Sequence, residues 1–169
     1  MADQKPQLAH FAAHMKAIPG SHSAAQVGAL CFRHTEIGQI EVLLITTRET
    51  RRWTIPKGWP IKGLKPHEVA EREAWEEAGI KGKAKKKPYG YYTYLKRLAD
   101  SRTIPAVVEV HALEVKEACD IFPEFGQRVL IWLPPAEAAL QVPEPELKGL
   151  LAAFDERSLI HDHIVPIGP

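Results

Sequence analysis

Apolar residues along the chain form short runs that predict β-strands on either side of one helix. A small, apolar run over residues 24–32 and a β-branched run over residues 40–46 flank a polar link that contains a glycine, which is typical of a hairpin. Further strands are predicted over residues 53–55, 88–98, 104–115 and 128–133. None of these runs reaches the roughly 18 apolar residues that a membrane-spanning helix needs.

The helical pattern is strongest over residues 65–78, which are rich in Ala and Glu. Pro66 suits the first turn of a helix, where its missing N–H is not needed, and Gly79 suits the C-terminal stop. Two later helices are predicted over residues 134–140 and 144–154. The order of strands, helix, strands and helices predicts an α/β fold with a mixed sheet.

The length and composition fit a single globular domain. A chain of 169 residues, of which 45% are hydrophobic and 25% charged, has enough apolar material for a core that needs no disulfide or structural metal. We expect an N-terminal arm over residues 1–22, the folded domain over residues 23–158 and a C-terminal tail over residues 159–169.

Charge and cysteine content narrow the class of protein. The net charge of +1 at pH 7 argues against a nucleic-acid binder held by bulk charge. Cys31 and Cys119 are too few for a disulfide framework, and the chain shows no zinc-site spacing. Because the pattern contains no secretion signal and no membrane span, we expect a cytoplasmic protein.

Three glutamates lie on one face of the helix predicted over residues 65–78. Glu73, Glu76 and Glu77 are spaced i, i+3, i+4, and like charges at this spacing destabilise an isolated helix by about 0.2–0.5 kcal/mol per pair. A divalent cation offsets such repulsion, and Mg²⁺ prefers oxygen ligands of this kind. Three such glutamates are more often a solvated acidic face than a metal site. The surrounding sequence is therefore needed to choose between these two interpretations.

The segment that contains these glutamates resembles the motif of a known enzyme family. Residues 58–80 read GWPIKGLKPHEVAEREAWEEAGI and resemble the Nudix box, G-x5-E-x7-R-E-U-x-E-E-x-G-U, in which U is a bulky aliphatic residue. The matching positions are Gly58, Arg72, Glu73, Glu76, Glu77, Gly79 and Ile80. Leu64 replaces the first glutamate of the box, and Ala74 replaces a larger aliphatic residue. The replacement by Leu64 is expected to lower metal affinity or rate, since losing a residue that supports metal ligands typically costs about 10–100-fold.

The resemblance extends over about residues 24–154. The segments VGALCFR, EVLLITTRETRRWTIPKG and RVLIWLPPAEAAL follow the order found in the diphosphoinositol polyphosphate phosphohydrolase branch of the Nudix family, which also handles dinucleoside polyphosphates. This resemblance implies the Nudix α/β/α sandwich around a mixed sheet. It also implies metal-dependent hydrolysis of a diphosphate linkage in a small, highly phosphorylated substrate, either a diphosphoinositol polyphosphate or a dinucleoside polyphosphate.

Roles for residues of the box follow from the same resemblance. Glu73, Glu76 and Glu77 are expected to bind Mg²⁺, or Mn²⁺ in its place, and one of them is expected to activate the attacking water. Gly58 is expected to offer its carbonyl oxygen to a metal ion. Arg72 is expected to orient the glutamates through a salt bridge.

Residues outside the box are expected to complete the site. Some Nudix enzymes take a further metal-binding carboxylate from a later loop, for which the candidates are Glu124 first, then Asp120 and Glu117. Arginine forks bind pairs of phosphate oxygens and lysines add point charge. The candidate substrate-binding residues are therefore Arg48, Arg52, Lys57 and, with weaker support, Arg102. Plain solvation is an equally open interpretation of each.

Several alternatives stay open. The lysine-rich residues 81–87 are either favourable cations after a helix C-terminus or a rim that attracts a polyanion. The protein is alternatively a Nudix hydrolase of another nucleoside diphosphate derivative or of capped RNA. A third possibility, kept open by Leu64, is a catalytically weak Nudix-fold binding module. The oligomeric state does not follow from the sequence.

Overall fold

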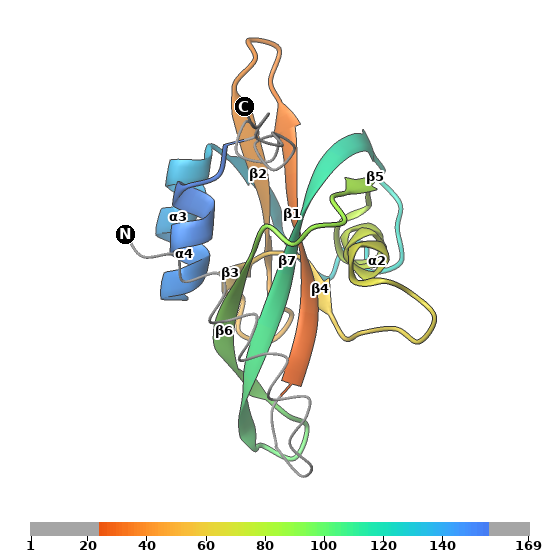
Figure 1. Ribbon diagram of the computed structural model, residues 1–169, viewed down its shortest axis with the longest axis vertical. Helices are drawn as coiled ribbons and strands as arrows, with labels where there is room; N and C mark the ends of the chain where they lie inside the picture. Colours follow the sequence, from red (N-terminus) through yellow and green to blue (C-terminus); the bar gives the residue numbers. More distant parts are fainter. Residues whose placement is uncertain (1–23, 156–169) are drawn as a thin grey trace, which may run out of the picture.

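The centre of the structure, a computed structural model that describes residues 24–155, is a mixed sheet of eight strands (Figure 1). The strands are β1 (Ala24–His34), β2 (Ile40–Thr46), β3 (Trp53–Thr54), β4 (Lys57–Gly58), β5 (Ile80–Ala84), β6 (Gly90–Arg97), β7 (Thr103–Ala118) and β8 (Leu130–Leu133). The helices are α2 (Pro66–Ala78), α3 (Pro135–Gln141) and α4 (Pro145–Ala152). The arm and the tail expected over residues 1–22 and 159–169 lie outside the described residues.

The sheet is organised around the long parallel pairing of β1 with β7. Ala24 lies opposite Ala106 at one end of this pairing, and Phe32 lies opposite Glu114 at the other. Along the other edge of β1, β2 pairs with the end of the strand, and β4 pairs near its start through Val27 opposite Gly58. The first residues of the box resemblance are thereby joined to the central strand.

Helices cover both faces of the sheet, with α2 on one face and α3 and α4 on the other (Figure 1). Ala70 and Ala74 of α2 are fully buried, because their small side chains let the helix approach the sheet closely. Leu147 and Leu151 of α4 are fully buried in the core on the opposite face. This layering confirms the expected α/β/α sandwich.

Local interactions set both ends of α2, which carries the glutamates. The N–H of Lys65 donates to the Glu68 carboxylate at 2.6 Å, and Pro66 occupies the first turn. At the other end Gly79 adopts a left-handed φ of 68°, and its N–H donates to the Trp75 carbonyl at 3.0 Å. The helix predicted over residues 65–78 is therefore confirmed, with Gly79 as its stop.

Strands β4 and β5 are not predicted by the sequence, which places them in a loop and in the lysine-rich stretch. In β5, Ile80 and Ala84 are buried while Lys81 and Lys83 are exposed. The Lys81 Nζ lies 3.7 Å from a Glu117 carboxylate oxygen. Two lysines and a glycine in a five-residue strand conceal its apolar alternation, so only pairing with β7 reveals it. This arrangement favours the structural interpretation of the lysines.

The described helices also bear on the expectation that the chain does not span a membrane. None of the helices within residues 24–155 combines the length and apolar character that crossing a bilayer requires. The expectation of a cytoplasmic protein stays a prediction.

Candidate active site

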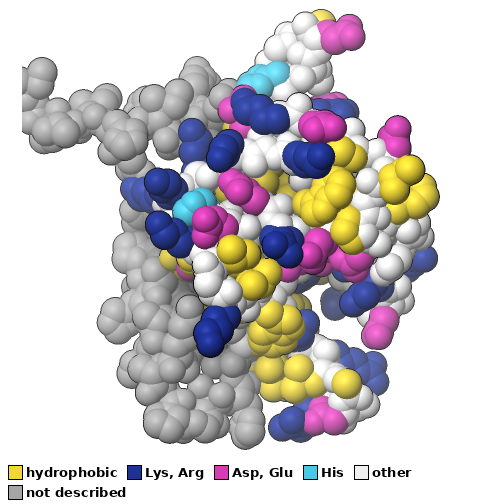
Figure 2. Space-filling model, turned by 90° about the vertical axis from the view of Figure 1, so that its right-hand side faces the viewer, with side chains coloured by type: hydrophobic (Ala, Val, Ile, Leu, Met, Phe, Trp, Pro, Cys, Tyr) yellow, Lys and Arg dark blue, Asp and Glu magenta, His cyan; other side chains and the backbone are white. Residues whose placement is uncertain are grey.

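An open cleft of about 560 Å³ lies where α2, β4, β6 and the loop between β2 and β3 meet. Acidic and basic side chains share its lining: Glu73, Glu77, Arg48, Arg52, Lys57, Lys96, Arg97 and Arg128. Figure 2 shows acidic, basic and hydrophobic side chains interspersed on the side of the molecule that carries α2. The cleft therefore unites the glutamate helix with most of the cations that the sequence singles out.

Glu73 lies against the backbone of strand β4. A β-carbon added to Gly58 would collide with both carboxylate oxygens of Glu73. Because Gly58 is held in the sheet by its pairing with Val27, the strand cannot easily move away. The glycine at the start of the box is therefore required for the Glu73 carboxylate to occupy this position.

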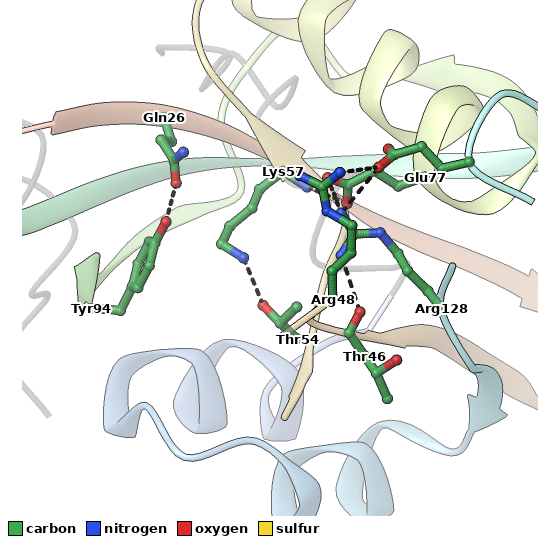
Figure 3. Close-up of polar contacts among 9 residues, drawn as sticks. Gln26, Thr46, Arg48, Thr54, Lys57, Glu77, Tyr94 and Arg128 are labelled. Atoms are coloured by element: carbon green, nitrogen blue, oxygen red, sulfur yellow. Dashed lines mark hydrogen bonds and ion pairs between the residues drawn. The ribbon is translucent and has the colours of Figure 1, made fainter. Parts of the chain in front are cut away.

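Glu77 is the most enclosed of the three box glutamates, with 8% of the residue exposed. Its Oε1 accepts a hydrogen bond from the Arg128 Nη2 at 3.1 Å, and its Oε2 accepts one from the Lys57 backbone N–H at 3.3 Å (Figure 3). These contacts join α2 to β4 and to the segment that precedes β8. The Glu77 carboxylate is thus held from two sides at the cleft.

Burial and mutual repulsion weaken the acidity of this pair. Burial, with smaller contributions from the charges of Glu76 and Glu124, raises the pKa of Glu73 to about 7. Burial also raises the pKa of Glu77 to about 7, against the opposing attraction of Arg128 and Lys57. Burial lowers the pKa of Lys57 to about 8, with Glu77 opposing that change. Enclosure in the protein is therefore the main reason why both carboxylic acids are weaker than usual.

Glu76 and Glu124 lie at the edge of this acidic group. The Arg72 guanidinium approaches Glu76 at 3.5 Å, which is the salt bridge expected for Arg72. Glu124 pairs with Arg128 and with Arg48, each at 3.5 Å, and its N–H donates to the Glu76 carbonyl at 3.0 Å. Glu124 interacts electrostatically with Glu73 and Glu77, whereas Glu117 pairs with Lys81.

The donor chemistry of this site fits a hard divalent cation, because carboxylate and carbonyl oxygens are the ligands that Mg²⁺ prefers. Within residues 24–155, however, no three acidic, histidine or cysteine side chains are already grouped as a metal site. Glu76 turns to Arg72, and Glu77 turns to Arg128 and Lys57. Glu73, Glu77 and Gly58 all line the cleft.

The cleft gathers three of the four predicted substrate-binding residues. Arg48, Arg52 and Lys57 line it. Arg102 lies instead in the turn between β6 and β7, where its Nε donates to Asp100 at 2.6 Å, and it is not among the residues that line the cleft. Lys96 and Arg97, at the end of β6, line the cleft, whereas Arg102 does not.

Arg128 is a functional candidate that the sequence does not identify. Its side chain is 8% exposed, and it reaches Glu77 across a separation of 51 residues in the chain. No local motif marks such a contact. The nearest signal in the sequence is that an arginine begins an otherwise apolar predicted strand. Arginine is rarely buried unless it is paired with an opposite charge.

Polar and aromatic side chains lie beside the charged residues of the cleft. The Tyr94 hydroxyl donates to the Gln26 side-chain carbonyl, and the Lys57 Nζ donates to the Thr54 hydroxyl at 3.3 Å (Figure 3). The same Lys57 ammonium lies 5.1 Å from the centre of the Tyr94 ring. At the mouth, Trp59 remains 48% exposed. The cleft therefore offers aromatic as well as charged surface.

Leu64, which replaces the first glutamate of the box, faces a different environment. It lines a small pocket of about 70 Å³ together with Pro60, Pro66 and Val69. It also packs against the core beneath α2. This position is built for an apolar side chain and is not among the residues that line the cleft.

Sequence comparisons give a consistent family. Residues 24–154 match the model of the NUDIX domain. Nudix hydrolase 13, mitochondrial, from Arabidopsis thaliana is 31% identical over 105 residues, which cover 59% of this chain and 52% of that protein. The chain thus spans about half the length of this curated relative.

Solved structures share the fold at low sequence identity. An Ap4A hydrolase binary complex from C. elegans has a TM-score of 0.59 at 21% identity, covering 82% of this chain and 98% of that one. The E. coli dihydroneopterin triphosphate pyrophosphohydrolase has a TM-score of 0.57 at 15% identity, covering 77% and 93%. The NUDIX domain of Shewanella oneidensis NrtR with ADP ribose has a TM-score of 0.53 at 20% identity, covering 90% and 94%. With its fold, its box segment and the family match over residues 24–154, the chain belongs to the Nudix family.

Proposed function

We propose that this protein hydrolyses a diphosphate linkage in a small polyphosphate substrate with the help of Mg²⁺ or Mn²⁺. The observation that carries the proposal is the pair of enclosed carboxylates, Glu73 and Glu77, at a cleft lined by Arg48, Arg52 and Lys57. A bound ion neutralises phosphate charge and lowers the pKa of a water molecule. Glu73, Glu77 and the Gly58 carbonyl hold the ion, with Glu76 and Glu124 as neighbouring donors.

In the reaction, a water oxygen attacks one phosphorus and the bond from that phosphorus to the bridging oxygen breaks. A carboxylate of the acidic group accepts the proton of the water, and the bridging oxygen leaves with the other phosphate. Arg48 and Arg52 bind phosphate oxygens in pairs, and Lys57 adds positive charge from the inner wall. The group that accepts the proton is one of Glu73, Glu76 and Glu77, with Glu77 the most enclosed.

The lining of the cleft favours a nucleoside as the organic part of the substrate. Trp59 is 48% and Leu95 is 69% exposed, and both line the cleft beside its charged end. A flat base gains from stacking on such a surface by about 1–3 kcal/mol. Dinucleoside polyphosphates combine such a base with many phosphates, and a neighbour in fold is described as an Ap4A hydrolase.

Diphosphoinositol polyphosphates are the second candidate. Lys96 and Arg97 add to Arg48 and Arg52, so cations are numerous on both sides of the cleft. A ligand with phosphates on every side would use all of them and would make no base-stacking contact with Trp59, whose ring centre lies 5.1 Å from the Lys96 Nζ. The two candidate substrates therefore differ in whether they need Trp59 for base stacking.

Phosphate release with Mg²⁺ or Mn²⁺ tests the proposal on dinucleoside polyphosphates, diphosphoinositol polyphosphates, other nucleoside diphosphate derivatives and capped RNA. We expect wild type to be active and Glu77→Gln to lose about 10–100-fold or more. The exposed Glu117, which pairs with Lys81 away from the cleft, supplies a matched control as Glu117→Gln. If wild type and Glu77→Gln are equally inert on the whole panel while a nucleotide still binds, the binding-module alternative is correct.

A second variant separates the two substrate candidates. Trp59→Ala is expected to raise KM for a dinucleoside polyphosphate by about tenfold, because stacking is lost. The same change is expected to raise KM for a diphosphoinositol polyphosphate by less, since that ligand carries no base and loses only the support that the Trp59 ring gives to Lys96. Equal effects on both substrates would contradict a stacking role for Trp59.

A further inference from the structure

Arg128 lies at a junction of three parts of the site. Its Nη1 donates to the Thr46 carbonyl at 3.0 Å, and its Nη2 donates to Glu77 at 3.1 Å. The same Nη2 lies 3.5 Å from a Glu124 oxygen. The side chain is 8% exposed, and its Nε finds no hydrogen-bond partner within residues 24–155.

A guanidinium this enclosed requires stabilising interactions from the residues around it. Arginine stays protonated in proteins, and an enclosed charge is strongly unfavourable unless opposite charge is close. Electrostatic repulsion also acts between Glu73 and each of the two carboxylates that Arg128 contacts, Glu77 and Glu124. Arg128, together with the attraction of Lys57 for Glu77, therefore offsets the negative charge of this acidic group when nothing else is bound. Arg48 also approaches Glu124, but it is 62% exposed and its charge is screened by water.

Arg128 occupies a carboxylate that a metal ion at this site would need. The Glu77 oxygen that Arg128 engages belongs to one of the carboxylates proposed to hold the ion. A divalent cation that approaches this carboxylate meets a positive charge in direct contact with it. The metal ion and the guanidinium would both be stabilised by the same Glu77 carboxylate.

We propose that Arg128 is the resident counter-ion of the carboxylate site, so that a divalent cation binds in competition with it. This inference rests on the proposed metal-dependent function. Arg128 is then a positioning residue that stabilises the metal-free protein and weakens the binding of the metal. Its effect on affinity is opposite in sign to that of a residue that only holds a ligand in place.

Binding of Mg²⁺, measured by calorimetry at pH 8.5 on the full chain, tests this competition. Arg128→Met keeps an unbranched apolar side chain and removes the charged guanidinium. We expect Arg128→Met to bind Mg²⁺ more tightly by about fivefold or more, because the competing charge is gone. The metal-free variant should unfold at a lower temperature than wild type, and Mg²⁺ should raise its unfolding temperature by more than it raises that of wild type.

Two further variants make the result decisive. Arg51→Met is the matched control, since Arg51 is exposed and donates to the Gln127 carbonyl at 3.2 Å rather than to a carboxylate. Its Mg²⁺ affinity should equal that of wild type. Arg128→Lys keeps the charge and loses the fork, so it should also bind as wild type does. This variant decides the matter if Arg128→Met does not fold.

Unchanged or weaker Mg²⁺ binding by Arg128→Met would overturn the inference, as would a loss of about fivefold or more in Arg128→Lys. Either result would mean that Arg128 orients Glu77 for the metal instead of competing with it. If wild type binds Mg²⁺ and only the order of the variants is wrong, the proposed function stands without this inference. If wild type takes up no divalent cation, both fail.

Discussion

The carboxylate of Glu73 occupies the space in which any residue other than glycine at position 58 would place its β-carbon. Because Gly58 pairs with Val27 in the sheet, helix α2 and strand β4 are fitted to each other at this point. The contact links the first and the central parts of the box segment. It also defines a substitution that alters the geometry of the site while every charge is kept.

Gly58→Ala is expected to lower activity by about 10–100-fold, because the new methyl group displaces the Glu73 carboxylate. Stability should change by less than about 1.5 kcal/mol, since the displaced group is the tip of a flexible side chain. Substrate turnover and urea unfolding measure the two effects. Gly149→Ala in α4 is the matched control, because its new β-carbon meets no atom within 4 Å. It should keep full activity and gain about 0.5–1 kcal/mol of stability. Full activity in Gly58→Ala would contradict the role given to this contact.

The stability of the metal-free protein is expected to fall as the pH rises from about 5 to 8. Burial raises the pKa of both Glu73 and Glu77 from 4.5 to about 7, so in this window the folded protein holds protons that the unfolded chain has released. The free energy of unfolding therefore decreases with pH. Urea unfolding at several pH values in EDTA measures the slope.

The matched comparison for that slope is the double variant Glu73→Gln, Glu77→Gln. It lacks both titrating groups, so its free energy of unfolding should fall less than that of wild type between pH 5 and 8. Saturating Mg²⁺ should also reduce the fall in wild type, since a bound cation offsets the charge that develops. Parallel pH profiles for wild type and the double variant would show that these carboxylates are not the source.

Leu64→Glu restores the glutamate of the box but is expected to give no gain in activity. The side chain at this position packs with Pro60, Pro66 and Val69 rather than facing the cleft. A carboxylate there loses apolar contacts, and we expect a loss of about 1–3 kcal/mol in the free energy of unfolding. Leu64→Met, which conserves volume, should cost less than about 1.5 kcal/mol. A rise in phosphate release by Leu64→Glu would mean that the position can still serve the metal site.

Gly79→Ala is expected to destabilise the protein by more than the strain of its backbone conformation alone. Gly79 has a φ of 68°, and a β-carbon there would collide with the Phe122 ring and the Cys119 carbonyl. Gly38 has a similar φ of 78° but no atom within 4 Å of an added β-carbon, so Gly38→Ala measures the strain by itself, about 1–2 kcal/mol. Urea unfolding should show a loss for Gly79→Ala that is larger by at least about 1 kcal/mol. Equal losses would mean that the loop after β7 moves aside freely.

Several features of the molecule were accessible to local reasoning. The i, i+3, i+4 spacing of Glu73, Glu76 and Glu77 and the stop at Gly79 depend only on helical geometry and on glycine conformation. The alternation of strands and helices is likewise a property of neighbouring residues. The box spacing carried the family resemblance, which the family match over residues 24–154 supports.

Other features depended on which segments the sheet brings together. Pairing with β7 made residues 80–84 a strand despite their lysines, and pairing with β1 placed Gly58 against Glu73. The contact of Arg128 with Glu77 spans 51 residues, and no short-range pattern encodes it. Arg102, in contrast, was predicted from its residue type to bind phosphate, but it lies in a turn and pairs with Asp100. Local sequence determined the helix and its charges because those interactions act within a few residues. The choice of partner for each charge belonged to the tertiary structure, because burial and electrostatics act between residues that only folding brings into contact.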